Sequence, residues 1–244
     1  GPRGTEVRLL VAREGWGEPR EIKVTRQVIN VPIVNTTKRN DGVFVISVAT
    51  FTSNSPDLFR NALREFKLSG YNKLIIDMRG NPGGYLEAAV QMSSWFMPAG
   101  KVVVTEDYAG HEENIVHRSM GYNVFGKEIQ TVILMDKGSA SASEIFAGAM
   151  RFQAGSKLVG TNSFGKGSVQ ELIDISDDTS LKITVARWLG PDGHQIPLTG
   201  IVPDYEVKLT EEDVAAGRDP QMDKALEVLG VKAPSKAATS TKQR

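Results

Sequence analysis

KLIIDMRGNPGG (residues 73–84) is the stretch that says most about the fold. Its first part, KLIID, is a short continuous apolar run, which is typical of a strand that is buried on both faces. The run ends in a turn that contains Gly80, Gly83 and Gly84. Glycines let backbone N–H groups approach a bound group without an intervening side chain. The stretch therefore predicts a strand of a buried parallel sheet, with its turn at the carboxyl end of the strand, where functional groups gather.

Strand and helix patterns alternate on both sides of this stretch. The predicted strands cover 42–51, 73–79, 101–106, 131–136 and 157–160, and the predicted helices cover 56–69, 86–97 and 141–150. The first helix has Ser55 as its N-cap and Pro56 at its first position, and Gly70 ends it. Residues 35–41 are predicted to be a polar link and 169–189 a β-hairpin. This alternation predicts an α/β fold, with a mixed, largely parallel sheet flanked by helices.

The two ends of the chain differ from this pattern. Near the N-terminus, 7–12 and 21–29 are β-like runs joined by turn-forming residues, so a hairpin is predicted there. The last residues, 231–244, are mostly small, polar or basic, and we predict a disordered tail. The chain is thus expected to divide into an N-terminal segment (1–30), a main domain (31–230) and the tail.

The composition of the 244 residues argues against several classes of function. Lys plus Arg and Asp plus Glu both number 29, so the formal net charge is zero, and no overall electrostatic footprint for nucleic acid is present. The sequence has no cysteine, which excludes disulfides, thiolate metal sites and a cysteine nucleophile. Its three histidines, His111, His117 and His194, are dispersed and predicted to lie at the surface. Neither a metal nor an organic cofactor is predicted.

Ser141 lies where the loop DKGSASASE (136–144) passes from a predicted strand into a predicted helix. Ser141 and Glu144 have the spacing of a capping box, in which the serine hydroxyl caps the first helical turn. A serine at such a junction can instead be a nucleophile, because N–H groups of the helix N-terminus and of the glycine turn could bind an oxyanion or a phosphate. On this motif alone the capping role is the commoner one, and Ser139 and Ser143 have similar structural interpretations.

Lys166 is the candidate base for such a nucleophile, because the chain offers no cysteine and no histidine in a recognisable pairing. The surrounding GTNSFGKGS (160–168) resembles a phosphate-binding loop. However, Gly167 stands where that loop needs Ser or Thr, and the residues after it alternate like a strand. Ser163 and Lys166 also have the S-x-x-K spacing of penicillin-binding enzymes, but no K-T-G element is present. Both interpretations fit poorly.

Four blocks together resemble the C-terminal processing peptidases, or tail-specific proteases, which are serine endopeptidases. The blocks are DMRGNPGG (77–84), KGSASASEIFAGAM (137–150), GTNSFGKGSVQ (160–170) and LTGIVPDYEV (198–207). Their order and spacing agree with the family over nearly all of residues 30–230. The resemblance implies the crotonase-like core of tail-specific proteases. It also implies hydrolysis of peptide bonds in unfolded or C-terminally marked proteins, through an acyl-enzyme and without a cofactor.

The resemblance also implies roles for particular residues. Ser141 corresponds to the nucleophile of the family, Lys166 to its base, and Gln170 to the residue that orients the lysine. The oxyanion donors would be backbone N–H groups of Ala142, Gly83 and Gly84, with Gly84 preferred over Gly83.

The first thirty residues resemble the last two strands of a PDZ domain, which precedes the catalytic part in this family. We expect a fragment that lacks the family's leader and most of that PDZ domain, so that its peptide groove is incomplete. The resemblance further implies an extracytoplasmic location (periplasm or cell envelope), protein or peptide substrates, and a homo-oligomer or an adaptor protein as a possible assembly. Two other classes stay open, a catalytically silent peptide-binding module of the same fold and a nucleotide-binding protein.

Overall fold

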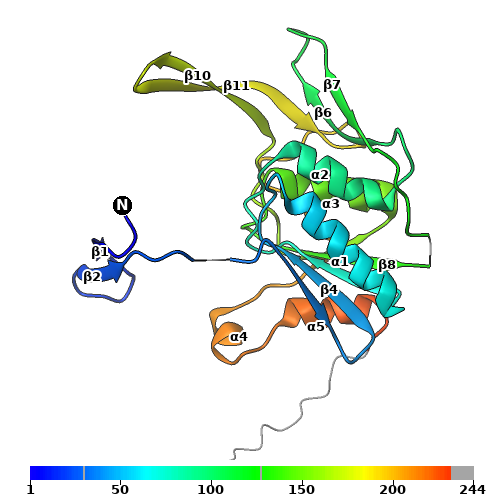
Figure 1. Cartoon of the computed structure of the whole chain (residues 1–244), viewed down its shortest axis with the longest axis horizontal. Helices are drawn as coiled ribbons and strands as arrows, with labels where there is room; N and C mark the ends of the chain where they lie inside the picture. Colours follow the sequence, from blue (N-terminus) through cyan, green and yellow to red (C-terminus); the bar gives the residue numbers. More distant parts are fainter. Residues whose placement is uncertain (30, 127, 232–244) are drawn as a thin grey trace, which may run out of the picture. The chain divides into compact units, whose positions relative to one another are not determined.

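The computed structural model describes residues 1–29, 31–126 and 128–231 (Figure 1). The chain divides into two units, Gly1–Pro32 and Ile33–Arg244. Apart from Val231, the predicted disordered tail lies outside the described residues. Within the described residues, no helix has the length and apolar character needed to cross a membrane.

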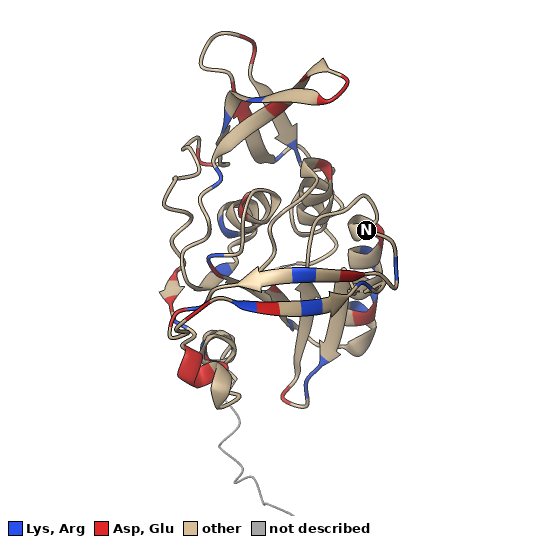
Figure 2. Ribbon diagram, turned by 90° about the vertical axis from the view of Figure 1, so that its left-hand side faces the viewer, with Lys and Arg blue, Asp and Glu red and all other residues tan. Residues whose placement is uncertain are grey.

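The first unit is a β-hairpin, as the sequence predicts. β1 (Glu6–Val11) pairs antiparallel with β2 (Arg20–Thr25), and charges of both signs alternate along the two strands (Figure 2). β2 ends at Thr25 instead of residue 29, and Arg26 adds two further backbone hydrogen bonds, to Thr5 and from Gly4. That this hairpin is part of a PDZ domain stays a prediction.

A six-stranded sheet forms the centre of the second unit, in the order β12–β9–β8–β5–β4–β3. Its strands are β3 (Val34–Lys38), β4 (Val43–Val48), β5 (Lys73–Asp77), β8 (Gln130–Met135), β9 (Lys157–Gly160) and β12 (Tyr205–Glu206). All neighbouring strands run parallel except β3, which is antiparallel to β4. The predicted mixed, largely parallel sheet is thereby confirmed.

Both faces of this sheet are covered by helices, which explains the continuous apolar runs of its strands (Figure 1). On one face, Leu74 and Ile76 belong to a core shared with α1 (Ser55–Ser69), α2 (Leu86–Ser93) and α3 (Ala142–Ala154). On the other face, Ile75 packs in a core shared with α5 (Pro220–Val228), to which Ala225 and Leu226 belong. A short helix, α4 (Glu211–Ala215), precedes α5.

The structure corrects three local predictions. Ser55 is the first residue of α1 and not its cap: Asn54 occupies the N-cap position, and the Ser55 hydroxyl donates to the carbonyl of Thr52 at 2.8 Å. The predicted polar link overlaps the edge strand β3, whose polar side chains suit a strand that has a partner strand on one side only. The predicted helix 86–97 is shorter, because α2 gives way to the 3₁₀ turn η1 (Ser94–Phe96).

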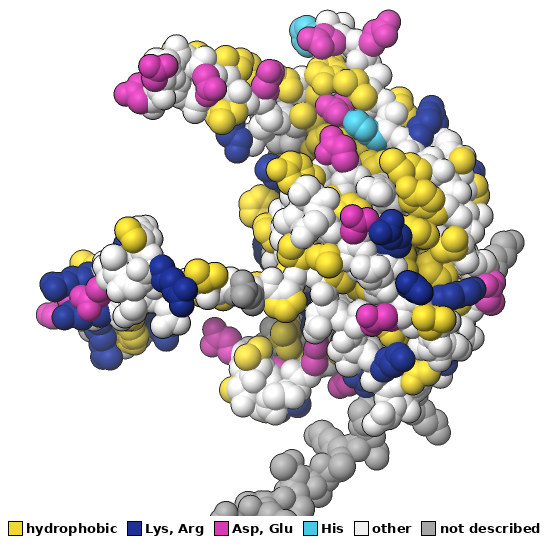
Figure 3. Space-filling model, in the orientation of Figure 1, with side chains coloured by type: hydrophobic (Ala, Val, Ile, Leu, Met, Phe, Trp, Pro, Cys, Tyr) yellow, Lys and Arg dark blue, Asp and Glu magenta, His cyan; other side chains and the backbone are white. Residues whose placement is uncertain are grey.

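A second, four-stranded antiparallel sheet has the order β10–β11–β6–β7. Its strands are β6 (Val102–Asp107), β7 (Ile115–Arg118), β10 (Ser168–Ser176) and β11 (Thr179–Leu189). The polar stretch around His117 was not predicted to be a strand, but it forms β7, and His117 bonds to Glu106 of β6 at 2.7 Å. The β10–β11 hairpin projects from the unit and has an acidic tip, which contains Asp174, Asp177 and Asp178 (Figure 3).

Candidate active site

Three serines follow β8, and their burial separates their roles. Ser139 and Ser143 are 1% and 0% exposed. The Ser139 hydroxyl donates to the carbonyl of Met78 at 2.8 Å, and the Ser143 hydroxyl donates to the carbonyl of Asn81 at 2.9 Å. Ser141 is partly exposed. Of the three hydroxyls, the one on Ser141 is therefore the one that a substrate can reach without dismantling a buried hydrogen bond.

Ser141 occupies the N-cap position of α3 with an unusual backbone, φ 54° and ψ −116°. A positive φ is uncommon for a residue with a Cβ atom and marks a functional position in many proteins. Glu144 lies across from it as in a capping box, and its Oε2 accepts the N–H of Ser141 at 2.8 Å. The N–H of Glu144 also donates to the carbonyl oxygen of Ser141 at 2.8 Å.

The glycine turn after β5 lies directly against the serine loop. A Cβ atom on Gly83 would come within 2.5 Å of the Ala140 carbonyl oxygen and 2.9 Å of the Ser141 Cβ. Asn81 holds the two loops together, because its carbonyl accepts the N–H of Ala140 at 3.1 Å. Its buried side chain bonds to the carbonyl of Val48 at 2.8 Å and to the N–H of Gly83 at 2.9 Å. The turn is therefore fixed against β4 as well as against the serine loop.

Two backbone N–H groups beside Ser141 stay free for an incoming group. Gly84 forms a parallel bridge with Phe51, in which the neighbouring residues Gly83 and Tyr85 make the two hydrogen bonds, so the N–H of Gly84 points away from this pairing. Ala142 is the first residue of α3, where an N–H has no partner inside the helix. Among the described residues, neither N–H is paired.

A buried carboxylate connects the serine loop with the lysine loop. Glu144 is 0% exposed and accepts four hydrogen bonds. Oε2 accepts the N–H of Ser141 at 2.8 Å and the N–H of Lys166 at 2.9 Å. Oε1 accepts the Ser163 hydroxyl at 2.5 Å and the N–H of Gly165 at 2.8 Å. The capping-box spacing drew attention to Glu144, but no pattern in the sequence indicated its bonds to residues 163–166.

Lys166 is thus brought to the serine loop, whereas Gln170 is less closely tied to it. Lys166 is half-buried and precedes β10, and Gln170 lies on β10 with an exposed side chain. The spacing of Lys166 and Gln170 predicts that both lie on the same side of one strand. However, Lys166 precedes β10, so this alternation does not extend to it. The orienting role of Gln170 stays a prediction.

Gly83→Ala is expected to abolish activity and destabilise the second unit. The new methyl group would meet the backbone of the serine loop, and alanine at φ +95° adds strain of about 1–2 kcal/mol. Gly80→Ala is the matched control, because Gly80 also has a positive φ but nothing lies within 4 Å of its added Cβ. Urea unfolding and activity assays of both variants test this, and equal losses in the two would contradict the close contact.

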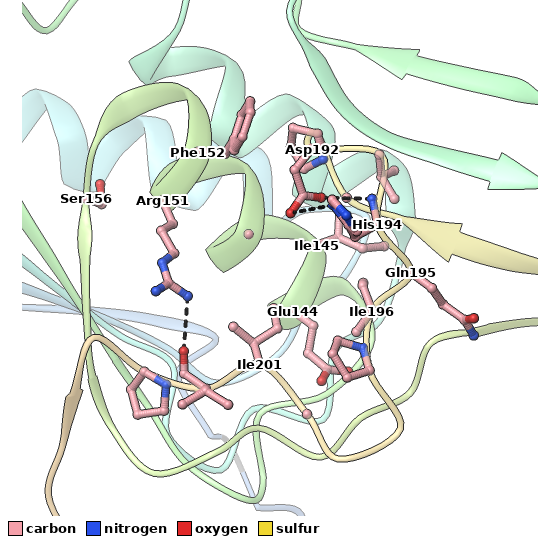
Figure 4. A pocket seen from close by; sticks show the side chains of 18 of the residues that line it. Glu144, Ile145, Arg151, Phe152, Ser156, Asp192, His194, Gln195, Ile196 and Ile201 are labelled. Carbon is pink, nitrogen blue, oxygen red and sulfur yellow. Dashed lines mark hydrogen bonds and ion pairs between the residues drawn. The ribbon is translucent and has the colours of Figure 1, made fainter.

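A cavity of about 640 Å³ lies beside α3, and it is separate from the candidate site (Figure 4). Glu144, Ile145 and Phe152 line it from α3, together with Ile196 and Ile201 from the loop after β11. Neither Ser141 nor Lys166 lines it. In the part of the chain that the structure describes, no three His, Cys, Asp or Glu side chains are grouped to hold a metal ion.

The fold and this site define an α/β protein with a strained, partly exposed serine at a strand-to-helix junction. Residues 42–207 match Peptidase family S41, and the chain belongs to that family. The resemblance to C-terminal processing peptidases is thereby confirmed.

Similar proteins agree with this assignment. The chain is 36% identical over 207 residues to a probable CtpA-like serine protease of Staphylococcus haemolyticus, and the match covers 85% of this chain and 41% of that protein. A probable CtpA-like serine protease of Staphylococcus aureus (strain N315) shows the same identity and coverage. Among solved structures, the photosystem II D1 C-terminal processing protease has a TM-score of 0.71 and 28% identity, over 85% of this chain and 57% of that one. The chain thus spans less than half the length of these curated relatives.

Proposed function

We propose that this chain is the catalytic part of a serine endopeptidase in which Ser141 is the nucleophile and Lys166 the general base. One observation carries the proposal: a single oxygen atom of Glu144 accepts the backbone N–H groups of both Ser141 and Lys166. Two residues that are 25 positions apart in the sequence are thereby held at one point. A hydroxyl nucleophile needs a base that is held close to it, and the sequence has no cysteine and no histidine in a recognisable pairing with Ser141.

The proposed reaction proceeds through an acyl-enzyme. The Ser141 oxygen bonds to the peptide carbonyl carbon while its proton passes to the Lys166 amine. The N–H groups of Gly84 and Ala142 stabilise the oxyanion that forms, and Gly84 is favoured over Gly83 because the Gly83 N–H already donates to Asn81. The C–N bond then breaks and the leaving amine takes the proton from Lys166. A water molecule, deprotonated in the same way, releases the acid product.

Exposed apolar side chains beside the site support an unfolded polypeptide as the substrate. Tyr85 follows the proposed oxyanion donor and is 60% exposed, and Phe164 precedes the lysine and is 59% exposed. Leu198, whose carbonyl would lie 2.2 Å from a Cβ on Gly165, is 78% exposed. Such surface can bury apolar side chains that a folded substrate keeps inside. Gln170 as the residue that orients Lys166, a PDZ origin for the first unit and an extracytoplasmic location belong to the same proposal, as do a homo-oligomer or an adaptor partner.

Replacement of Lys166 tests the proposed base. Lys166→Met keeps the length of the side chain and removes the amine, and it should lower kcat by about 10²–10⁴-fold, the usual size of a general-base contribution. Lys137→Met is the matched control, because Lys137 is exposed in the loop before Ser141. Cleavage of an unfolded protein is followed for both variants. A Lys166→Met variant that cleaves like the parent chain excludes this lysine as the base.

A chelator tests the cofactor-free mechanism. EDTA should leave the rate unchanged. Loss of activity in EDTA that zinc or magnesium restores would replace this mechanism with a metal-dependent one.

A further inference from the structure

Arg79 opens the glycine turn and is held by two separate parts of the chain. Its Nε donates to Asp77 Oδ1 at 3.0 Å and its Nη2 to Asp77 Oδ2 at 2.7 Å, a two-pronged ion pair at the end of β5. Its Nη1 donates to Asp219 Oδ1 at 2.8 Å and to Gln221 Oε1 at 3.1 Å. Because the Arg79 side chain is only 17% exposed, these bonds are little weakened by water.

Asp219 and Gln221 belong to the start of α5 and are themselves fixed. Asp219 is the N-cap of α5, and the same Oδ1 that binds Arg79 accepts the N–H of Met222 at 3.0 Å. Gln221 is 2% exposed, and its Nε2 donates to the carbonyl of Val207 at 2.9 Å. α5 packs on the sheet face opposite α3. The glycine turn is therefore tethered, through Arg79, to a helix on the far side of the sheet.

The ionisation of this group favours the tether. Burial acts to lower the pKa of Arg79, but the bonds to Asp77 and Asp219 outweigh it and raise the pKa. Burial likewise acts to raise the pKa of Asp219, and the hydrogen bonds from Arg79 and from the Met222 N–H outweigh it, so this pKa is lowered. Both groups are charged at neutral pH, and the contact is an ion pair.

The turn that Arg79 opens reaches the reacting atoms in a few residues. The N–H of Gly80 donates to Asp136 Oδ1 at 2.8 Å, and Asn81 is bonded to the serine loop. The side chain of Arg79 extends from this turn to the start of α5, which lies outside the serine and lysine loops. A shift of the Arg79 side chain would therefore be passed on to the N–H of Gly84.

We propose that Asp219 and Gln221 are positioning residues, through which the C-terminal helix α5 holds Arg79 and thereby the Gly84 N–H at its place in the oxyanion site. This inference rests on the proposed function, because it takes the Gly84 N–H as an oxyanion donor. It assigns no contact between these two residues and the substrate. An oxyanion donor acts on the transition state and not on the bound substrate. Loss of the tether should therefore lower kcat and leave KM unchanged.

Two substitutions of Asp219 separate this role from helix capping. Serine is a good N-cap, but its shorter side chain does not reach the Arg79 guanidinium. Asp219→Ser should lower kcat about tenfold at unchanged KM. Asparagine keeps an oxygen for both Arg79 and the Met222 N–H, so Asp219→Asn should have a higher kcat than Asp219→Ser, although its neutral oxygen binds Arg79 less strongly than the carboxylate does. Thr210→Ala removes the N-cap of α4 and controls for a general loss of stability.

The outcomes distinguish this inference from the proposed function. If Ser141→Ala is inactive while Asp219→Ser has the kcat of the parent chain, the tether is not needed and the inference is wrong. It is also wrong if Asp219→Ser raises KM alone, if Asp219→Asn is as slow as Asp219→Ser, or if Thr210→Ala is equally slow. If Ser141→Ala cleaves normally, the proposed function fails first. Should Asp219→Ser not fold, Gln221→Ala provides the same kcat-against-KM comparison without touching the cap.

Discussion

Ser141→Ala is expected to abolish proteolysis by this chain, with a loss of at least about 10⁴-fold in kcat. The substitution removes one hydroxyl and leaves the proposed oxyanion donors and Lys166 in place. Its effect on the free energy of unfolding should not exceed about 1 kcal/mol, the typical cost of a lost N-cap, because Ser141 occupies the N-cap position of α3. Cleavage of an unfolded protein and urea unfolding are the two measurements.

Ser139→Ala and Ser143→Ala are the matched controls. Both remove a hydroxyl from the same loop, and both hydroxyls donate to buried backbone carbonyls. These variants should lose about 0.5–1.5 kcal/mol of stability, the net contribution of one hydrogen bond, because the Met78 and Asn81 carbonyls each keep a backbone donor. They should keep measurable activity at a temperature where they are folded. An active Ser141→Ala variant alongside an inactive, folded Ser139→Ala or Ser143→Ala variant would move the nucleophile to another serine.

Glu144→Gln is expected to have the largest effect on stability, although the side chain keeps its size. The carboxylate accepts four hydrogen bonds with its two oxygens, from Ser141, Ser163, Gly165 and Lys166. A glutamine has one acceptor oxygen, so its amide NH₂ would face two of these donors. At about 1–3 kcal/mol for each unsatisfied buried group, the loss should amount to about 2–6 kcal/mol. Activity should fall with it, because the serine and lysine loops lose their common anchor.

Glu87→Gln is the control for that result. Glu87 lies in the first turn of the neighbouring helix α2 and is exposed. Its replacement should change the free energy of unfolding by less than about 1 kcal/mol, the size of a helix-dipole contribution. Amide hydrogen exchange of residues 160–168 adds a local readout, since protection of the Gly165 and Lys166 N–H groups should drop in Glu144→Gln. Unchanged protection and stability would show that the carboxylate does not hold the two loops.

The parallel strands and the covering helices could be predicted from their apolar residues. Burial on one face spaces these residues at a regular interval, and burial on both faces makes the apolar run continuous. KLIID is continuous because Leu74 and Ile76 face one core and Ile75 the other. β3 was missed because an edge strand has few apolar side chains, and VNTTK carries only one. Ser-Pro is a common helix start and predicts Ser55 as the N-cap, but Asn54 holds that position.

By itself, the sequence determined the family, the α/β class and the residue types of the candidate site, because these depend on local patterns in fixed order. Only the tertiary structure decided how the site is held together. Glu144 meets Ser163, Gly165 and Lys166 across about 20 residues, and Arg79 meets Asp219 across 140. It also decided that Ser139 and Ser143 are buried, while Ser141 is partly exposed. Such bonds join side chains that the folded backbone brings together, and no local period records which distant donor will meet a given carboxylate.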